Sequence, residues 1–158
     1  LKFTCTSGSA KIIGVNWHTV PWTEVRRQDM RFLGNWSTDT YSTLEFPFTD
    51  TSGSSYEFEF TGSGCLLLMA CHESAGLVDI WIDGVQVYDT RNLYDSAAAT
   101  KFTRSLIVSP SLLSWGSGGV YGRHSVRVEM VGNTGSAVTP SAGFRRLMPL
   151  AAYAIDLR

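Results

Sequence analysis

The feature that most constrains the fold of this chain is the regular alternation of aliphatic residues with other residues through residues 78–87. The alternation runs into and out of Asp83-Gly84, a residue pair that two-residue hairpin turns prefer because both central positions need a positive φ. A period of two is typical of a β-strand with one buried face. The segment therefore predicts two antiparallel strands joined by a tight turn.

Strand geometry gives one tryptophan of this hairpin an unusual setting. The aliphatic positions 78, 80 and 82 share one face of the predicted strand, so Trp81 lies on the opposite face between Asp79 and Asp83. An exposed indole can stack against the C–H face of a sugar, and the carboxylates can accept hydrogen bonds from its hydroxyl groups. The alternative is that the long segment 91–121 or another subunit covers this face.

Strand-like segments follow one another along the whole chain, separated by clusters of Gly, Ser, Asn and Pro. Helix signals are weak, and residues 95–99 suggest no more than a short turn. Two sheets with one apolar face each bury those faces against each other, which predicts an all-β fold, an antiparallel two-sheet β-sandwich. The predicted strands are residues 11–15, 40–48, 55–61, 65–72, 78–82, 85–89, 105–108, 124–131 and 152–157.

Three segments lack this alternation. Residues 65–70 are apolar on both faces, which predicts a central strand covered by the partner sheet on one side and by a loop or a neighbouring subunit on the other. The aromatic residues 17–22 predict a loop packed onto the sandwich or an interface arm. Residues 91–121 form the longest irregular stretch, and long loops on sandwiches are places where function tends to lie.

The size and charge of the chain restrict its class. A length of 158 residues suits one core, and no repeat or linker divides it, so we expect residues 1–158 to form a single domain excised from a larger protein. The 13 Lys and Arg against 14 Asp and Glu give a net charge of -1, which creates no field for phosphate backbones or anionic lipids. We therefore expect no nucleic-acid binding and no membrane insertion.

The cysteines point to a reducing compartment. Cys65 and Cys71 are six residues apart in one predicted strand, a separation of about 20 Å in extended geometry. A disulfide needs Cα atoms about 4.4–6.8 Å apart, so these two residues cannot bond to each other. Cys5 can reach one of them, but buried thiols are the favoured interpretation. We therefore expect folding in a reducing cytoplasm, even for a protein that acts on an extracellular surface or a virion.

Four short segments, taken in order, resemble a known family. They are residues 31–37 with Gly34-Asn35-Trp36-Ser37, residues 56–64, residues 78–84 and residues 122–128. Their pattern is similar to the galactose-binding-like jelly rolls that occur as accessory modules beside SGNH-type carbohydrate esterases and in phage tail fibres and tailspikes. The resemblance implies a jelly-roll sandwich that often recognises carbohydrate. It also implies that Trp36 and His124 are packed or hydrogen-bonded rather than in contact with a ligand.

Signals for catalysis and for metal binding are weak. The chain has neither a Gly-x-Ser-x-Gly elbow nor the Gly-Asp-Ser of an SGNH hydrolase, and its histidines and cysteines lack zinc-site spacing. His124 and Ser125 are adjacent on a predicted strand, so their side chains point to opposite faces. Aspartates at positions 39, 50, 83, 89 and 95 form no loop of regular calcium-binding spacing. We therefore expect a protein that is not an enzyme and needs no cofactor, and we assign no metal ligands, with a calcium ion at these aspartates left as an alternative.

The candidate ligand-binding residues come from the hairpin and from the long segment. Aromatic rings next to arginines provide stacking surfaces and forked donors, although packing within the loop explains the second group equally well. The candidates are Trp81, Asp79 and Asp83 in the hairpin and Arg91, Tyr94, Trp115, Tyr121 and Arg123 in or beside the long segment.

These residues predict a non-catalytic carbohydrate-binding domain of a surface or virion protein, such as a phage tail fibre or tailspike that recognises its host. Such a site is weak on its own and gains strength from several copies. One alternative is a structural, homotrimeric module of a phage fibre, in which Trp81 and residues 65–70 are buried between subunits. The other is an accessory domain of a carbohydrate esterase.

Overall fold

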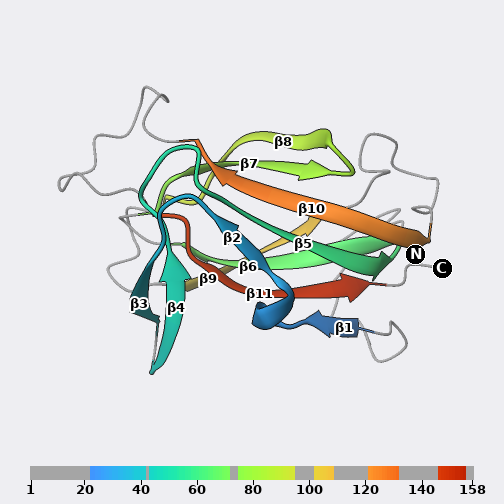
Figure 1. The fold of residues 1–158 in the computed structure, drawn as a ribbon, viewed down its shortest axis with the longest axis horizontal. Coiled ribbons are helices and arrows are strands. Elements are labelled where there is room, and N and C mark those ends of the chain that lie inside the picture. The colour runs from blue at the N-terminus through green and yellow to red at the C-terminus, as the bar shows by residue number, and fades with distance from the viewer. Residues whose placement is uncertain are drawn as a thin grey trace, which may run out of the picture.

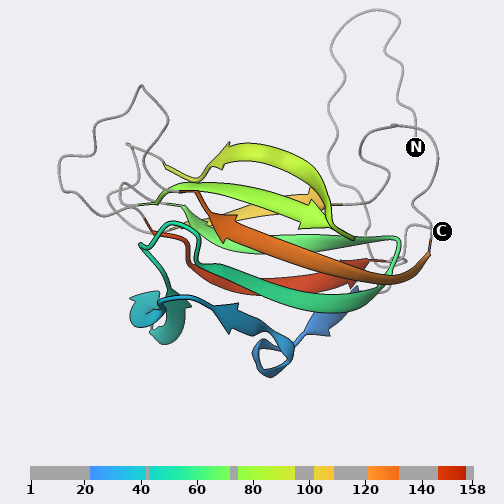
Figure 2. The same cartoon turned by 45° about the horizontal axis from the view of Figure 1, so that its top comes forward.

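Two antiparallel β-sheets face each other across the core, as the sequence predicts (Figure 1; Figure 2). The computed structural model describes residues 22–41, 43–71, 75–94, 102–108, 121–131 and 146–155. Within these ranges the only helical element is a single 3-10 turn, η1 (Arg27–Asp29), and no helix there is long and apolar enough to span a bilayer. The prediction of an all-β, two-sheet jelly-roll sandwich is confirmed.

One sheet has four strands in the order β1-β11-β6-β9, and the other has five in the order β2-β5-β10-β7-β8. The chain changes sheet at each step from β5 to β6 and from β6 to β7, so strands adjacent in the sequence face each other. The strands of the first sheet are β1 (Trp22–Val25), β11 (Pro149–Ile155), β6 (Gly64–Cys71) and β9 (Phe102–Val108). Those of the second sheet are β2 (Arg31–Leu33), β5 (Ser55–Gly62), β10 (Gly122–Met130), β7 (Leu77–Ile82) and β8 (Val85–Asn92).

The core lies between the sheets and follows directly from strand alternation. On β5 the even-numbered residues Phe58 and Phe60 are buried, and on the neighbouring β10 so are Val126 and Val128. Leu67 of β6 belongs to the same apolar cluster. Burying an aliphatic or aromatic side chain of this size stabilises the fold by about 1.5–3 kcal/mol, so these inward faces fix which side of each strand is left for solvent.

The predicted hairpin turn is present between β7 and β8. Asp83 has a φ of 51° and Gly84 a φ of 78°, the left-handed pair that the tight hairpin turn requires. The register Ile82↔Val85 closes the hairpin directly around them. This turn keeps Trp81 on the face opposite to the buried Ile80 and Ile82, as the alternation predicts.

Residues 40–48 were predicted as one strand, which is wrong. The structure has a separate two-stranded sheet of β3 (Ser37–Tyr41) and β4 (Leu44–Phe48), in which Tyr41 pairs with Leu44. The chain therefore reverses direction where a continuous strand was expected. Thr43, with a hydroxyl side chain that tolerates turns, lies at the reversal.

The β3–β4 hairpin packs beside the first sheet, on the side away from the second sheet (Figure 1). Phe46 of β4 forms a small buried cluster with Ala70 and Met148, and Phe48 packs against it. Arg146 pairs with Asp39 of β3 at 2.5 Å, which ties the hairpin to the segment before β11. Part of the apolar outer face of β6 is therefore covered by another segment of the same chain. This agrees with the first of the two covers predicted from the sequence, a loop of the chain or a neighbouring subunit.

The expectation of loop structure at residues 17–22 and 91–121 needs correction. Residue 22 begins β1, which pairs with β11. Residues 91 and 92 continue β8, and residues 102–108 form β9, which pairs with β6 from Cys65 to Cys71. A buried central strand needs partners for its amide and carbonyl groups on both sides, and β9 supplies them on one. The strand predicted at residues 11–15 and the last two residues of that predicted at 152–157 lie outside the described residues.

The glycine-rich segment before β3 has a structural role, as the resemblance implies. Gly34 adopts a φ of 87°, and the next amide, of Asn35, donates a hydrogen bond to Oγ of Ser54 at 3.1 Å. Trp36 packs edge-on against Phe32 with ring centroids 4.8 Å apart, and its Nε1 donates to the Leu33 carbonyl at 2.9 Å. The segment fixes the start of β3 and leaves Trp36 in the packing.

Two of the three cysteines are described, and both are buried in β6. Cys65 and Cys71 are thiols, in agreement with the geometric argument against a bond between them. Burial raises the pKa of the Cys65 thiol to about 12, although a backbone hydrogen bond from Tyr153 opposes the shift. Cys5 lies outside the described residues. Both thiols belong to the core rather than to a reactive site.

Candidate functional site

A row of charged side chains and one indole crosses the outward face of the second sheet. Glu57 of β5 pairs in register with Arg31 of β2 on one side and with Arg127 of β10 on the other. Arg127 in turn pairs with Trp81 of β7. Adjacent strands are about 4.8 Å apart and alternate residues share a face, so these four residues form a continuous line across four strands.

This row lies in a solvent-accessible groove of about 710 Å³. Residues on both sides of the row complete the walls, and they carry carboxylate, hydroxyl and backbone groups. The groove is lined by Asp29, Arg31, Glu57, Phe58, Glu59, Trp81, Gly84, Ser125, Val126 and Arg127. It therefore spans the outward face from the turn at the end of β7 to η1, and a ligand within it meets polar groups and an aromatic ring together.

Arg127 holds the indole in a defined environment. Its guanidinium carbon lies 5.3 Å from the centroid of the Trp81 ring, a cation–π distance. Nε of Arg127 lies 3.8 Å from Oε1 of Glu57, and its Nη2 forms an ion pair with Glu129. Trp81 is half-buried and lines the groove, so the sequence-based expectation that its ring faces outward agrees with the structure.

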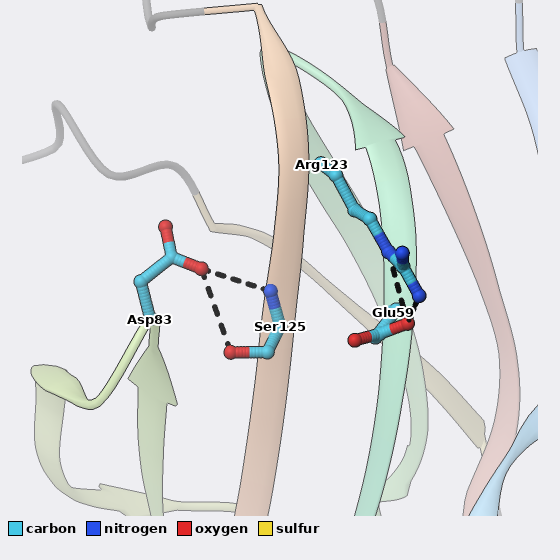
Figure 3. Close-up of polar contacts among 4 residues, drawn as sticks. All are labelled: Glu59, Asp83, Arg123 and Ser125. Atoms are coloured by element: carbon cyan, nitrogen blue, oxygen red, sulfur yellow. Dashed lines mark hydrogen bonds and ion pairs between the residues drawn. The ribbon is translucent and has the colours of Figure 1, made fainter.

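A second arginine, Arg123, lies on the same face of β10, four residues before Arg127. Arg123 forms an ion pair with Glu59 of β5, with Nε of Arg123 3.0 Å from Oε2 of Glu59 (Figure 3). Both side chains are more than half exposed, at 73% and 58%. Exposed ion pairs contribute about 0–1 kcal/mol to stability, so either partner can exchange this contact for a ligand at little cost.

Asp83 is engaged within the fold. Its Oδ1 accepts a hydrogen bond from the amide of Ser125 at 2.9 Å, and its Oδ2 lies 2.7 Å from Nδ1 of His124 (Figure 3 shows the contacts with Ser125). Burial tends to raise the pKa of Asp83, but the hydrogen bonds from His124 and Ser125 and the charge of His124 outweigh it and lower the pKa. Asp83 was predicted to contact ligand, whereas both of its oxygens here join the β7–β8 turn to β10.

His124 lies on the core side of β10, as the resemblance implies. It is 8% exposed, and its ring centroid lies 5.4 Å from that of Phe60. Ser125, the next residue, is exposed on the outward face and lines the groove. Adjacent residues on this strand therefore point to opposite faces, as expected, and the Ser125 hydroxyl contacts Asp83, at 3.4 Å.

A second hollow of about 480 Å³ adjoins the groove. Tyr121 and Arg123, both predicted site residues, line it together with Glu24 of β1. Tyr121, the residue directly before β10, is 43% exposed. The two hollows share Asp29 and Glu59 in their walls, so they meet on the outward side of β5.

The other predicted residues lie away from the groove or outside the description. Asp79 is half-buried on β7 opposite Glu129, on the outward face but not in the groove lining. Arg91 is exposed near the far end of β8, opposite Val78, and Tyr94 follows that strand. Trp115 lies outside the described residues. The structure thus places Trp81 in the groove and Tyr121 and Arg123 in the adjoining hollow.

Several groove residues were not among the sequence-based candidates. They lie at outward positions of β5 and β10, at the start of β2 and in η1 before it. They are Asp29, Arg31, Glu57, Glu59, Ser125 and Arg127. Alternation along residues 56–61 and 126–129 places the charged positions on a solvent face, which was the available signal. The sequence lacks the register that sets Arg127 beside Trp81, because register is a long-range property.

The described residues include no group of three or more His, Cys, Asp or Glu side chains arranged to hold a metal ion. Asp39, one of the aspartates considered for calcium, is paired with Arg146. Chemically, the groove offers carboxylate acceptors, guanidinium donors, a hydroxyl group and one aromatic surface, a set suited to binding a molecule with many hydroxyl groups.

Comparison with known proteins shows the fold. Neither a scan of family models nor a comparison with curated proteins finds a match. Among solved structures, a two-domain esterase active on acetylated mannans is similar, with a TM-score of 0.59 and 10% identity over 97% of this chain and 42% of its own. The chain is also similar to the CBM36-1 domain of a multidomain xylanase from the hindgut metagenome of Trinervitermes trinervoides, with a TM-score of 0.52 and 11% identity.

The coverage of these neighbours differs. The alignment with the CBM36-1 domain takes in 87% of this chain and 98% of that domain, whereas a xanthan lyase of Paenibacillus, with a TM-score of 0.55 and 9% identity, is covered over 13% of its length. The chain therefore spans less than half of the esterase and a small part of the lyase. At these identities the likeness shows a shared jelly-roll sandwich.

Proposed function

We propose that this chain is a non-catalytic carbohydrate-binding domain whose ligand lies in the groove on the outward face of the second sheet. The observation that carries the proposal is the position of Trp81. Its indole lies in an open groove of about 710 Å³, next to Arg127 and within a wall of carboxylate and hydroxyl groups. A sugar ring has an apolar C–H face and a polar rim, so it needs these two kinds of surface side by side.

Each part of the groove has a role in this proposal. The indole of Trp81 stacks on the C–H face of one sugar ring, and burial of that face drives binding. Glu57 and Glu59 accept hydrogen bonds from hydroxyl groups, and Arg127 donates them, as charge-assisted contacts that orient the ring. The site is shallow, so one domain binds weakly, and several copies on one particle bind strongly through avidity.

The contacts of Ser125 support a non-catalytic role. Its hydroxyl is directed to the carboxylate of Asp83, and the imidazole of His124 lies on the other face of the strand, engaged with the same carboxylate. In a serine–histidine pair the imidazole must lie within hydrogen-bond reach of the serine hydroxyl to take its proton. In the described part of the chain this serine and histidine do not form that contact.

The structural neighbours support the class of ligand. One is an esterase active on acetylated mannans, and another is a domain of a xylanase whose name marks it as a carbohydrate-binding module. Both act in the context of polysaccharides, and the second is almost entirely covered by this chain. Fold alone does not determine function, so we base the assignment of a carbohydrate ligand to this chain on the chemistry of the groove.

The test is a glycan array followed by calorimetry with wild type, Trp81→Ala and a matched control, Trp22→Ala. Trp22 is 42% exposed on β1 of the other sheet, so its removal changes a surface indole outside the groove. We expect binding by wild type and by the control and its loss in Trp81→Ala. Equal binding by all three proteins, or binding by none, would overturn the proposal.

A carbohydrate esterase accessory domain is the second candidate, because the chain covers 42% of a two-domain esterase. In that case the chain binds the polysaccharide while a separate domain removes acetyl groups. Incubation of the chain with acetylated mannan or xylan is expected to release no acetate. Release of acetate that Ser125→Ala abolishes would show instead that this chain is itself an esterase.

Placement in a phage fibre or virion, folding in a reducing cytoplasm and assembly as a homotrimer remain proposals. A trimeric fibre module would bury Trp81 between subunits, which makes the groove unavailable to glycans. Light scattering separates the alternatives, since a monomer that binds glycans supports the binding role. A stable trimer that Trp81→Ala dissociates, with no glycan response, supports the structural role.

A further inference from the structure

The two hollows on this side of the molecule share walls and chemistry. Asp29 and Glu59 line both, so a ligand that passes from one hollow to the other crosses these two carboxylates. Each hollow is also lined by one aromatic residue whose side chain is not buried, Trp81 in the first and Tyr121 in the second, whereas Phe58 and Phe60 in the same walls are core residues. The pair therefore has the composition of one elongated cleft with an aromatic ring near each end.

The distance between the two rings can be derived from strand geometry. Trp81 pairs in register with Arg127, and Tyr121, the residue directly before β10, lies six residues before Arg127 along the chain. At ~3.4 Å per residue, the backbone positions of the two aromatic residues are about 20 Å apart. A single sugar ring spans only a fraction of this length, so both rings can be occupied together only by a chain of several sugars.

The charge of the cleft restricts the ligand further. Among the described residues the two hollows are lined by four carboxylates, of Glu24, Asp29, Glu57 and Glu59, and by three guanidinium groups, of Arg31, Arg123 and Arg127. Arg123 is paired with Glu59, and Arg127 lies beside both Glu57 and Glu129. Asp29 in turn pairs with Arg26, which lies outside the lining. Two of the three lining arginines are thus paired with carboxylates, and the cleft offers an acidic ligand no net positive charge.

An acidic sugar in such a cleft would compete with the lining carboxylates for the guanidinium groups. It would also be repelled by the carboxylates that it displaces from those groups. A neutral sugar needs no such exchange, because its hydroxyl groups both donate to the carboxylates and accept from the arginines. The observed pairs, Arg123–Glu59 above all, supply an acceptor and a donor side by side across adjacent strands (Figure 3).

We propose that the two hollows form one cleft for an extended, uncharged oligosaccharide, with one end of the sugar chain stacked on Trp81 and the other on Tyr121. This inference rests on the proposed carbohydrate-binding function and specifies its ligand class. It assigns Tyr121 and Arg123 to the second half of the cleft and leaves Trp81 and Arg127 as the first. The length of the ligand and its lack of charge are the two properties that the proposal adds.

The experiment is a calorimetric titration of wild type, Trp81→Ala, Tyr121→Phe, Tyr121→Ala and the control Leu44→Ala with neutral β-1,4-linked mannose, xylose and glucose oligomers from disaccharide to hexasaccharide. Leu44 is 62% exposed on β4 and lines neither hollow. The expected affinity rises roughly tenfold or more from disaccharide to hexasaccharide, with tenfold equivalent to ~1.4 kcal/mol. Tyr121→Ala removes this gain, whereas Tyr121→Phe and Leu44→Ala keep it.

Oligogalacturonates of the same lengths test the charge argument. They are expected to bind at least about tenfold more weakly than the best neutral series, and Glu59→Gln is expected to narrow the difference. The inference is overturned if a disaccharide binds as tightly as a hexasaccharide, if Tyr121→Ala leaves the length dependence unchanged, or if the acidic series binds more tightly. Those outcomes leave the binding function intact, whereas absence of binding by every oligomer overturns both proposals.

Discussion

Nδ1 of His124 lies 2.7 Å from Oδ2 of Asp83, so an imidazole buried on the core side of β10 is joined to the turn between β7 and β8. The other oxygen of Asp83 accepts from the amide of Ser125 at 2.9 Å, and the Asp83 amide donates to the Ser125 carbonyl at 3.0 Å. An ionised carboxylate is an acceptor only, so His124 is the donor. These contacts attach the turn to the strand that forms the middle of the groove.

Replacing Asp83 with Asn tests the value of these contacts. Asn also tolerates a positive φ, so the turn is retained while the charge is lost. Hydrogen bonds to a charged group contribute about 1.5–3 kcal/mol, and the partial exposure of Asp83 reduces this, so we expect a loss of about 1 kcal/mol in the free energy of unfolding. Urea titration measures it. Asp50→Asn, at an exposed site, is the control, and an equal effect there would contradict the assignment.

The pH dependence of stability follows from the lowered pKa of Asp83. The carboxylate is more acidic in the folded protein than its unfolded value of about 3.9, so its contribution is fully present above that pH. The contribution is lost as the pH falls below about 3.9 and through the folded pKa. The difference in unfolding free energy between wild type and Asp83→Asn should therefore be constant at mildly acidic pH and shrink below about pH 4. A difference that grows on acidification would be inconsistent with this sign.

Gly34→Ala is expected to be more damaging than Gly53→Ala, although both glycines have a positive φ, of 87° and 82°. A Cβ at Gly34 would lie 2.6 Å from Oγ of Ser54 and 3.0 Å from its Cα, whereas at Gly53 it would meet nothing within 4 Å. The left-handed backbone costs about 1–2 kcal/mol at both sites. We expect an additional loss of about 1 kcal/mol or more at Gly34 from the overlap, measured by thermal or urea unfolding. Equal losses would exclude the close contact.

The buried thiols of β6 should be inert in the native protein. Burial raises the pKa of Cys65 to about 12, and the thiolate is the reactive form. In a Cys5→Ser variant, a colourimetric thiol reagent is therefore expected to label neither Cys65 nor Cys71 until the protein unfolds. Urea provides the positive control, because it exposes both. Rapid labelling without denaturant would show that β6 opens locally.

Arg127→Lys tests whether the planar guanidinium matters for the groove. Lysine keeps the positive charge but not the forked donors or the flat surface that faces the Trp81 ring. We expect glycan affinity to fall by roughly tenfold, equivalent to ~1.4 kcal/mol, with little change in stability because Arg127 is exposed. Arg27→Lys is the matched control, because the Arg27 guanidinium carbon lies 4.6 Å from the centroid of the Phe46 ring and neither residue lines the groove. Unchanged affinity would assign Arg127 to packing alone.

Local sequence signals were sufficient for the central strands. The Asp83-Gly84 turn and the alternation in residues 55–61 and 124–131 predicted β5, β7 and β10 to within two residues at either end. Those patterns are set by burial on one face and by turn geometry, both of which depend on neighbours in the sequence. The resemblance added the jelly-roll connection and the structural roles of Trp36 and His124.

The short strands and the groove were not predictable in the same way. β1 and β2 span too few residues to show a period, and their place is fixed by pairing with β11 and β5. The contact between Arg127 and Trp81 depends on which strands are neighbours and in which register. Such pairings join residues far apart in the sequence, so local alternation identifies the solvent face but not the partners on it.

The central position of β10 has a consequence for how this protein can change over time. Its even-numbered residues are committed to the interior, while positions 123, 125 and 127 face the groove or the hollow beside it. Specificity can therefore drift through replacements at those three sites while the scaffold keeps its architecture. Descendants of one ancestral domain could acquire different targets by this route without first losing their fold.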